Sequence, residues 1–221
     1  MKMNEHSLTV LKNFAGINPG IVFLKGKTQK TMNAEQTILA EAILDEDFTE
    51  SFGIYDLNQF LGNITTLNAP ELTFSSEVVT LNDGEIELNY YTCAPKLIVT
   101  PPNDRELSIE NPDVTFSLSQ SSLNKILKIG AMNDLPNISI LGNKKGLFVR
   151  THEMKNDTSN YADMRIDDYT GDNFSVTFKT EYIKLIPDNY TVMIKLGGFS
   201  CWTNANNTLK YFIAIEKKDK K

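Results

Sequence analysis

The amino-acid sequence predicts an α+β protein made of two duplicated domains, each an antiparallel sheet with two helices. Most of the 221 residues fall into short, partly alternating apolar segments separated by turn sequences, as antiparallel strands do. Four other segments carry apolar residues at helical spacing. The order helix, strands, helix, strands occurs twice, and the Leu-Lys-x-x-Ala pattern of residues 11–15 returns at 127–131. This repetition indicates a duplicated unit.

Two helices are expected in the first half of the chain. The first covers residues 7–17, and the second covers 56–68 with Asp56 placed to cap it. Each has one apolar face that would pack on a sheet. The turn sequence Asn82-Asp83-Gly84 precedes the last strand of this half. Strands are expected at residues 21–24, 37–43, 52–55 and 85–90.

The second half repeats this order. A third helix is expected over residues 119–133, with an apolar stripe that includes Leu123, Ile126 and Gly130. A short fourth helix is expected over residues 180–186, ended by Pro187. The strands of this half are expected at residues 146–150, 174–178, 190–194 and 209–215, with turns between them.

A proline-rich segment divides the two halves. Residues 94–112 contain four prolines, which favours a linker over a further strand or helix. The expected division is therefore an N-terminal domain at 1–93, an inter-domain linker at 94–112 and a C-terminal domain at 113–221.

Composition excludes several classes of protein. Two cysteines, Cys93 and Cys201, are too few for a disulfide scaffold or a cysteine-rich zinc site. No apolar stretch is long enough to span a bilayer, and the first residues lack the apolar core of a secretory signal. We therefore expect no membrane partner and a reducing cytoplasm as the location. The net charge is −6, and it is uneven: residues 1–110 carry 7 basic and 16 acidic side chains, whereas 111–221 carry 15 and 12.

Catalysis has no positive support in the sequence. The acidic clusters at residues 45–47 and 167–168 lack the spacing of an EF-hand and a histidine partner, so solvated loops are the favoured interpretation. His152 follows a strand and has no candidate nucleophile nearby, and phosphate loops, nucleophile elbows and zinc-protease motifs are missing. We expect no enzyme activity, no metal and no cofactor. A hydrolase with an aspartate-rich metal site is kept as a remote alternative.

Lysines on the expected helices suggest a different function. Each lies off the apolar stripe of its helix, and Lys125 and Lys128 are three residues apart on one face. Solvent-facing lysines are usually only solubilising, but four helices that present one face to the same partner would suit nucleic acid. The expected DNA-facing residues are Lys12, Lys125, Lys128 and Lys184.

Several stretches, spread over almost the whole chain, match a known family. Ile54-Tyr-Asp-Leu-Asn-Gln-Phe-Leu-Gly62 is the most specific, and Leu11-Lys-Asn-Phe-Ala15, Asp168-Tyr-Thr-Gly-Asp172 and Ile186-Pro-Asp-Asn-Tyr190 accompany it. On these stretches the chain resembles the DNA polymerase sliding clamps of T-even-type bacteriophages. The resemblance implies the DNA-clamp fold, with two duplicated domains per protomer. It also implies a homotrimer that closes head to tail, with helices lining the hole and sheets forming the outer wall.

The resemblance also implies partners and a task. A clamp of this family encircles double-stranded DNA without sequence preference and tethers the replicative DNA polymerase as a processivity factor, after a clamp loader has placed it. It would act in the cytoplasm of the infected host cell. Clamps of this kind receive short peptides of their partners, and the expected apolar pocket is Leu97, Ile98 and Val99 in the linker. An equally open alternative makes these three residues the last strand of the first domain. The alternative function is an acidic, β-rich structural or virion protein.

Overall fold

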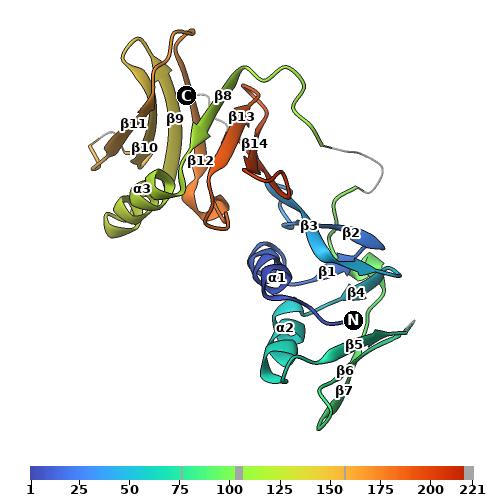
Figure 1. Ribbon diagram of the computed structural model, residues 1–221. Coiled ribbons are helices and arrows are strands. Elements are labelled where there is room, and N and C mark those ends of the chain that lie inside the picture. The colour runs from blue at the N-terminus through green and yellow to red at the C-terminus, as the bar shows by residue number, and fades with distance from the viewer. Residues whose placement is uncertain (76, 103–106, 157, 217–221) are drawn as a thin grey trace. The chain divides into compact units, whose positions relative to one another are not determined.

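The computed structural model describes residues 1–75, 77–102, 107–156 and 158–216 (Figure 1). The chain divides into two compact units. Unit 1 is Met1–Glu106 with Thr208–Lys210, and unit 2 is Leu107–Asn207 with Tyr211–Lys221. Residues 103–106 of the expected linker lie outside the described residues. No helix in the described part of the chain is long and apolar enough to cross a membrane.

Unit 1 places two helices beside antiparallel strands. Helices α1 and α2 lie side by side, and α1 packs on β2 and β3 (Figure 1). Strand β1 pairs with β4, β2 with β3, and β6 with both β5 and β7, all antiparallel. The elements are α1 (Glu5–Ile17), β1 (Ile21–Phe23), β2 (Gly26–Met32), β3 (Ile38–Phe48), β4 (Phe52–Ile54), α2 (Leu57–Thr66), β5 (Glu71–Phe74), β6 (Val78–Asn82), β7 (Glu87–Tyr91) and the 3-10 turn η1 (Pro95–Leu97).

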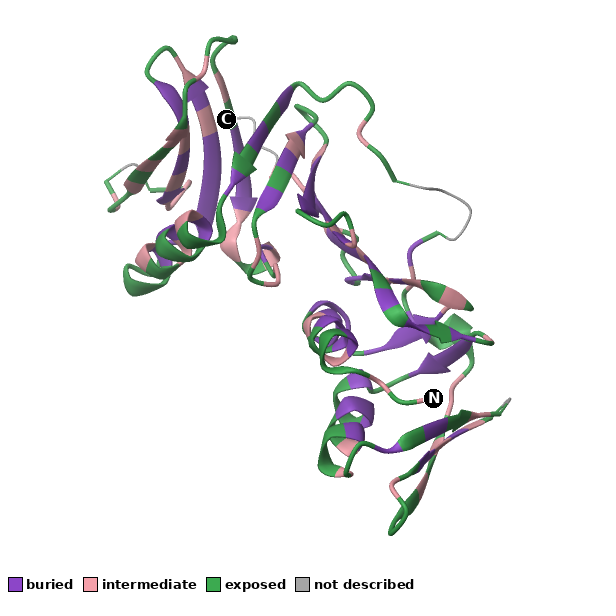
Figure 2. Ribbon diagram, in the orientation of Figure 1, coloured by how far each residue is buried: buried purple, intermediate pink, exposed green. Residues whose placement is uncertain are grey.

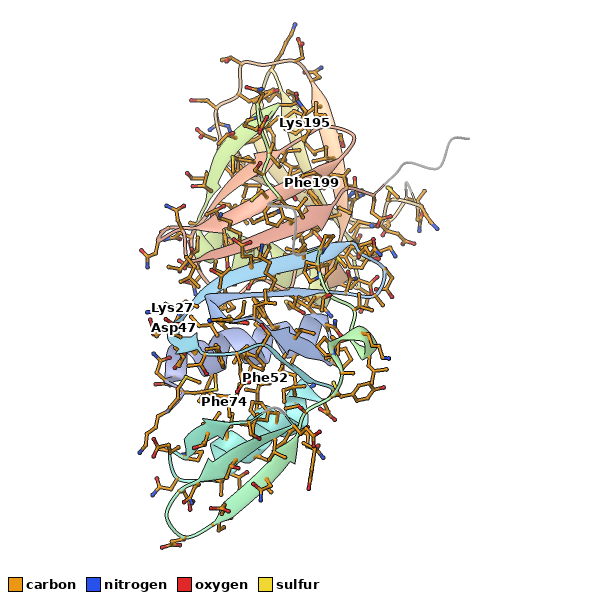
Figure 3. The ribbon with its side chains drawn as sticks, turned by 90° about the vertical axis from the view of Figure 1, so that its right-hand side faces the viewer. Lys27, Asp47, Phe52, Phe74, Lys195 and Phe199 are labelled. Carbon is orange, nitrogen blue, oxygen red and sulfur yellow. The ribbon has the colours of Figure 1, made fainter. Side chains whose placement is uncertain are left out.

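Phenylalanine rings hold these elements together. The Phe23 ring lies 4.8 Å from the Phe48 ring and 4.9 Å from the Phe52 ring, between ring centroids. Phe52 in turn lies 5.1 Å from Phe74, so the cluster links four strands (Figure 3). Phe60 of α2 meets the edge of Phe23 at 6.3 Å. Tilted and edge-on contacts of this kind add to the stabilisation that burial alone provides.

Caps define where the helices begin. The Asp56 side chain accepts a hydrogen bond from Gln59 N at 2.9 Å, which confirms the expected cap of α2. Asn4 caps α1 by accepting from Ser7 N at 2.8 Å. Glu46 anchors the same helix end, because its carboxylate accepts from Asn4 N at 2.7 Å and from the Ser7 hydroxyl. Glu46 is buried within β3, so the expectation of a solvated loop at residues 45–47 is wrong.

The described residues of unit 2 form one α-helix and eight strands, the last of which begins with two residues of unit 1. Strands follow the order β11-β10-β9-β12 in one sheet, and β15, β14, β13 and β8 are neighbours in another. Helix α3 packs on β10 and β11, and β9 is largely buried (Figure 2). The elements are β8 (Val114–Leu118), α3 (Gln120–Met132), β9 (Asn137–Asn143), β10 (Gly146–His152), β11 (Ala162–Asp167), β12 (Phe174–Lys179), the 3-10 turn η2 (Thr180–Tyr182), β13 (Tyr190–Ile194), β14 (Phe199–Asn204) and β15 (Leu209–Ala214).

The fourth expected helix does not form. Residues 180–182 make a single 3-10 turn, and the chain then runs irregularly to Pro187. Seven residues are too few to repay helix nucleation, and Pro187 prevents extension. Ile186 N instead donates to the Tyr211 hydroxyl at 3.2 Å, and its carbonyl accepts from the Tyr190 hydroxyl. Burial raises the pKa of Tyr190 and of Tyr211 above the ordinary value for tyrosine. Both hydroxyls therefore stay protonated and can donate or accept.

Two helical glycines are expected to respond oppositely to alanine. A Cβ at Gly130 of α3 would lie 2.6 Å from Thr151 Oγ1 of β10, so Gly130→Ala forces the helix off its sheet. We expect this change to destabilise the protein by about 1–3 kcal/mol, more than the helix propensity it adds. Gly62 of α2 is exposed, with nothing within 4 Å of the added Cβ, so Gly62→Ala is the matched control and should stabilise by about 0.5–1 kcal/mol. Denaturant unfolding of the two variants measures the difference; equal effects would contradict the close packing of α3.

Candidate nucleic-acid and partner interfaces

The exposed face of α1 carries one lysine, and that of α2 carries none. Val10, Leu11 and Phe14 are buried, and the apolar spacing leaves Lys12 on the opposite, solvent-facing side of α1. On α2 the exposed positions hold uncharged side chains: Asn58, Gln59, Gly62, Thr65 and Thr66. Unit 1 therefore offers a helical face with amides and hydroxyls around a single ammonium group.

The exposed face of α3 carries two lysines. Leu123, Ile126 and Gly130 point to the sheet, so Lys125 and Lys128 share the solvent side one turn apart. Lys184 is also exposed, but it follows η2 in irregular chain and does not project from a helix. Unit 2 thus holds three of the four expected DNA-facing lysines and unit 1 holds Lys12.

The expected peptide pocket begins with Leu97, the last residue of η1, and its three residues differ in exposure. Leu97 is 61% exposed and Val99 42%, whereas Ile98 is 9% exposed. Ile98 packs so closely on Gly20 and Gly53 that a Cβ at either glycine would lie 3.3 or 3.2 Å from its side chain. These residues form no strand, so the alternative of a final strand at this point is wrong.

Asn18 holds this segment in place. Its side-chain amide donates to Met32 O and to Val99 O, both at 2.9 Å. A small cavity of about 70 Å³ opens beside it, lined by Val22, Leu24, Lys30, Pro95, Thr100 and Pro101. A short peptide can use two exposed apolar side chains beside a cavity, here Leu97 at the end of η1 and Val99 on the anchored chain that follows it.

Among the residues that the structure describes, two sheets each have one covered edge and one open edge to which no strand is paired. In unit 1, Met1 pairs with Leu72 of β5 through hydrogen bonds of 2.7 and 2.8 Å, which covers that edge and leaves β7 as the other. In unit 2, Glu216 N donates to Thr177 O of β12 at 2.8 Å, which leaves β11 at the opposite edge. Exposed apolar side chains flank both open strands: Ile86 precedes β7, Tyr91 ends it, and Tyr161 precedes β11. Open edges of this kind are natural sites for strand pairing between chains.

Unit 2 has a concave surface that the sequence did not indicate. This concave surface has a volume of about 750 Å³ and lies on the four-stranded sheet, with His152 and Arg150 among its lining residues. His152 is the last residue of β10, and its Nε2 lies 2.7 Å from the hydroxyl of Ser139 in β9. The expectation that His152 lacks a nearby hydroxyl nucleophile was wrong because strand pairing, not sequence distance, brings Ser139 close. Within the described residues, no group of three or more His, Cys, Asp or Glu side chains could hold a metal ion.

The chain is similar in sequence to a known protein family. The family model for the DNA polymerase processivity factor matches residues 2–91. The chain is 27% identical over 221 residues to the sliding clamp of Vibrio phage KVP40, covering 98% of this chain and 99% of that one. It is 26% identical over 228 residues to the sliding clamp of Escherichia phage RB69, covering 98% and 97%.

A solved structure shares the fold along the whole chain. A. fulgidus PCNA, bound to the C-terminal region of FEN-1, aligns with a TM-score of 0.72 and 14% identity, over 99% of this chain and 98% of that one. This likeness confirms the expected α+β, DNA-clamp fold of antiparallel sheets. The expectation of two helices per domain holds for unit 1, where α1 and α2 form, but not for the described residues of unit 2, where α3 is the only α-helix.

Proposed function

Because the chain is a sliding clamp of the kind found in T-even-type phages, a DNA polymerase processivity factor, we propose that three copies close head to tail into a ring around duplex DNA. The ring catalyses no reaction and binds no cofactor or metal. A clamp loader places it on DNA, and it acts in the cytoplasm of the infected host cell. Domains at 1–93 and 113–221, joined by a linker at 94–112, supply its two similar halves. The observation that carries the proposal is the exposed lysines on α1 and α3 of an otherwise acidic chain.

Two physical requirements follow from the task. A processivity factor must stay on DNA and yet hold no position on it. Enclosure meets the first requirement, since a closed ring leaves only by opening or by passing a DNA end. Weak phosphate contacts meet the second, because they are independent of sequence and nearly equivalent at every step. Lys12, Lys125, Lys128 and Lys184 would supply these contacts, and a flexible ammonium lacks the bidentate geometry that would lock on one phosphate.

Ring closure uses the two open edges. A head-to-tail contact joins different surfaces of neighbouring copies and closes when its rotation matches the symmetry. Strand β7 of one copy and β11 of the next would extend one sheet across each of three interfaces, and the exposed side chains of Ile86 and Tyr91 beside β7 would then be covered. Pairing also removes edges that would otherwise aggregate.

Light scattering during size-exclusion chromatography tests the assembly. The clamp predicts a mass of about three times 24.9 kDa. The competing interpretation, an acidic structural or virion protein, predicts a monomer or a much larger shell. Either of these masses would count against the ring.

Leu97 is expected to anchor a peptide from the polymerase. An apolar side chain that is 61% exposed beside an anchored backbone can be buried by a partner at little cost in folding. Leu97→Asp and Val99→Asp should each weaken binding of the polymerase C-terminal peptide by at least about tenfold, a loss of about 1.4 kcal/mol. Fluorescence anisotropy of the labelled peptide measures this.

Three further variants make that result specific. Leu196→Asp changes a comparably exposed leucine of unit 2 and should leave peptide binding unchanged. Ile98→Asp should instead unfold unit 1, because Ile98 is buried against Gly20 and Gly53. Unaltered peptide affinity in a folded Leu97→Asp, Val99→Asp double variant would remove residues 97–99 from the peptide site.

A further inference from the structure

The concave surface of unit 2 lies on the sheet face opposite α3. Thr151 points to Gly130 of α3, and Arg150 and His152 precede and follow it in β10, so their side chains point to the other face. Ser139 pairs with Arg150 on one side and with Thr177 on the other, which puts all three on that face. Residues 153–156 and 159–161, which follow β10, form the wall of the concavity. Asn137 Oδ1 holds the start of this wall by accepting from Met154 N at 2.9 Å. We call this site the outer-face pocket.

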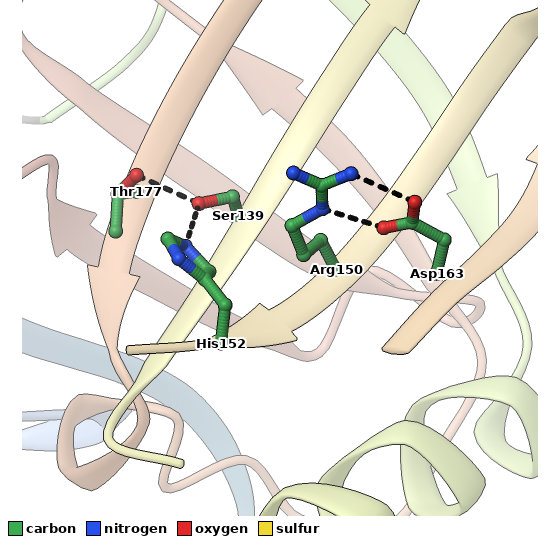
Figure 4. Close-up of polar contacts among 5 residues, drawn as sticks. All are labelled: Ser139, Arg150, His152, Asp163 and Thr177. Atoms are coloured by element: carbon green, nitrogen blue, oxygen red, sulfur yellow. Dashed lines mark hydrogen bonds and ion pairs between the residues drawn. The ribbon is translucent and has the colours of Figure 1, made fainter. Parts of the chain in front are cut away.

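Its floor contains a chain of three hydrogen-bonding groups. The Ser139 hydroxyl lies 2.7 Å from His152 Nε2 and 2.7 Å from Thr177 Oγ1 (Figure 4). When Nε2 carries the proton, His152 donates to Ser139 and Ser139 donates to Thr177. The hydroxyl hydrogen of Thr177 is then free to point into the pocket. An anion in the pocket favours this orientation, because the chain of donors then runs toward the anion and ends in the hydroxyl hydrogen of Thr177.

Arg150 adds a cationic donor at the same place. Its Nε and one terminal nitrogen donate to Asp163 at 2.6 and 2.8 Å, and Figure 4 shows the other terminal nitrogen directed toward the Ser139 side. The guanidinium carbon lies 4.6 Å from the centre of the Tyr161 ring, a cation–π contact that holds the group against the wall of the pocket. The ion pair and the ring fix the position of Arg150, so little further ordering is needed when a ligand binds.

Charge and size indicate the class of ligand. Arg150, His152 and Lys155 line the pocket, and among its described lining residues Glu153 is the only carboxylate. Leu141 and Met154 give it apolar surface, and about 750 Å³ is room for several amino-acid residues. A phosphate dianion fits less well than a carboxylate, because Asp163 already takes two Arg150 donors and Glu153 would repel a second negative charge.

We propose that the outer-face pocket docks an acidic peptide segment of a partner protein. A carboxylate of the peptide lies between Arg150 and the Thr177 hydroxyl, and an adjacent apolar side chain packs on Leu141 and Met154. The site is separate from residues 97–99, which belong to unit 1. A ring that carries it can hold a second partner segment while the first peptide site is filled.

The test uses the full protein labelled with ¹³C-methyl methionine, with the Met154 methyl signal as reporter. The probes are acetyl-Asp-Phe-Asp-amide, its matched neutral form acetyl-Asn-Phe-Asn-amide, and inorganic phosphate. We expect the acidic peptide to move the Met154 signal in a saturable way with a Kd near or below about 1 mM, and the neutral peptide to bind at least about tenfold more weakly. The methyl signal of Met3, in unit 1, should not move.

Variants assign the effect to the pocket. Arg150→Gln and Thr177→Val, which keeps the shape of the side chain, should each weaken binding of the acidic peptide by about tenfold. Arg165→Gln is the matched control, since it removes a neighbouring arginine of β11 that does not line the pocket, and binding should persist. No saturation up to about 10 mM, equal binding of both peptides, tighter binding of phosphate, or unchanged binding in folded Thr177→Val would each overturn the proposal. None of these readouts depends on DNA or on ring closure.

Discussion

Asn89→Pro is expected to convert the trimer into monomers while each copy stays folded. Thr92 N donates to Glu77 O and Asp83 N to Ile86 O, so alternate residues of β7, Leu88 and Tyr90, bond to β6. The N–H of Asn89 therefore points to the open edge. Proline removes this donor and places its ring where the next strand would lie. With about 1–3 kcal/mol lost at each of three interfaces, closure of the ring should fail.

Asn89→Ala is the control for this change. It removes the side-chain oxygen that accepts from Thr80 Oγ1 at 2.8 Å but keeps the backbone N–H. We expect it to remain a trimer, so that the two variants separate loss of the edge donor from loss of the side chain. Light scattering gives the mass and circular dichroism the fold. A folded Asn89→Pro protein that is still trimeric would exclude β7 from the ring interface.

Removal of the four expected DNA-facing lysines should weaken retention on DNA by at least about tenfold at low salt, to the same degree on every sequence. Each lysine that contacts a phosphate adds about 0.9 to the slope of log K against log salt concentration. The variant Lys12→Gln, Lys125→Gln, Lys128→Gln, Lys184→Gln should therefore show a shallower salt dependence. Its trimer mass should not change, because all four side chains are exposed.

A second quadruple variant controls for net charge. Lys25, Lys27, Lys144 and Lys145 are also exposed, and Lys27 is placed on β2 (Figure 3). Their replacement by glutamine removes the same charge from other surfaces and should leave the salt dependence of retention close to that of the unchanged protein. Equal losses in the two variants would mean that overall charge, not the helical faces, governs contact with DNA.

Helix prediction succeeded where local signals agreed. In α1 and α2 the apolar spacing, and in α2 the cap at Asp56, arise within the helix and can be seen in the sequence. Helix α3 follows the same logic, with Ser119 accepting from Ser122 N at its start. The segment at 180–186 has a weak apolar period, but its backbone bonds to the hydroxyls of Tyr190 and Tyr211. Because Tyr211 lies 25 residues beyond Ile186, this irregular path could not be predicted locally.

The features that the sequence left hidden depend on strand pairing. Five of the seven residues of strand β2 are polar or charged, so the strand has no continuous apolar pattern. In the sequence Glu46 has the pattern of a solvated acid, but in the fold it accepts a hydrogen bond from Asn4 at the start of α1. The outer-face pocket joins residues from β9, β10 and β12, and its hydroxyl chain exists only in the paired register. Lys12, Lys125 and Lys128, in contrast, needed only the helical period to be placed on exposed faces, whereas Lys184 is exposed in irregular chain.

Retention on circular and linear DNA tests the central claim, enclosure of the duplex, most directly. The protein is loaded on nicked circular DNA with the clamp loader of its phage and ATP, and the complex is washed at high salt to remove surface-bound protein. Enclosure predicts that the trimer stays on the circle through the wash and leaves within minutes when a restriction enzyme cuts the circle. Loss from the intact circle in the wash, or equal retention before and after cutting, would contradict a closed ring around DNA.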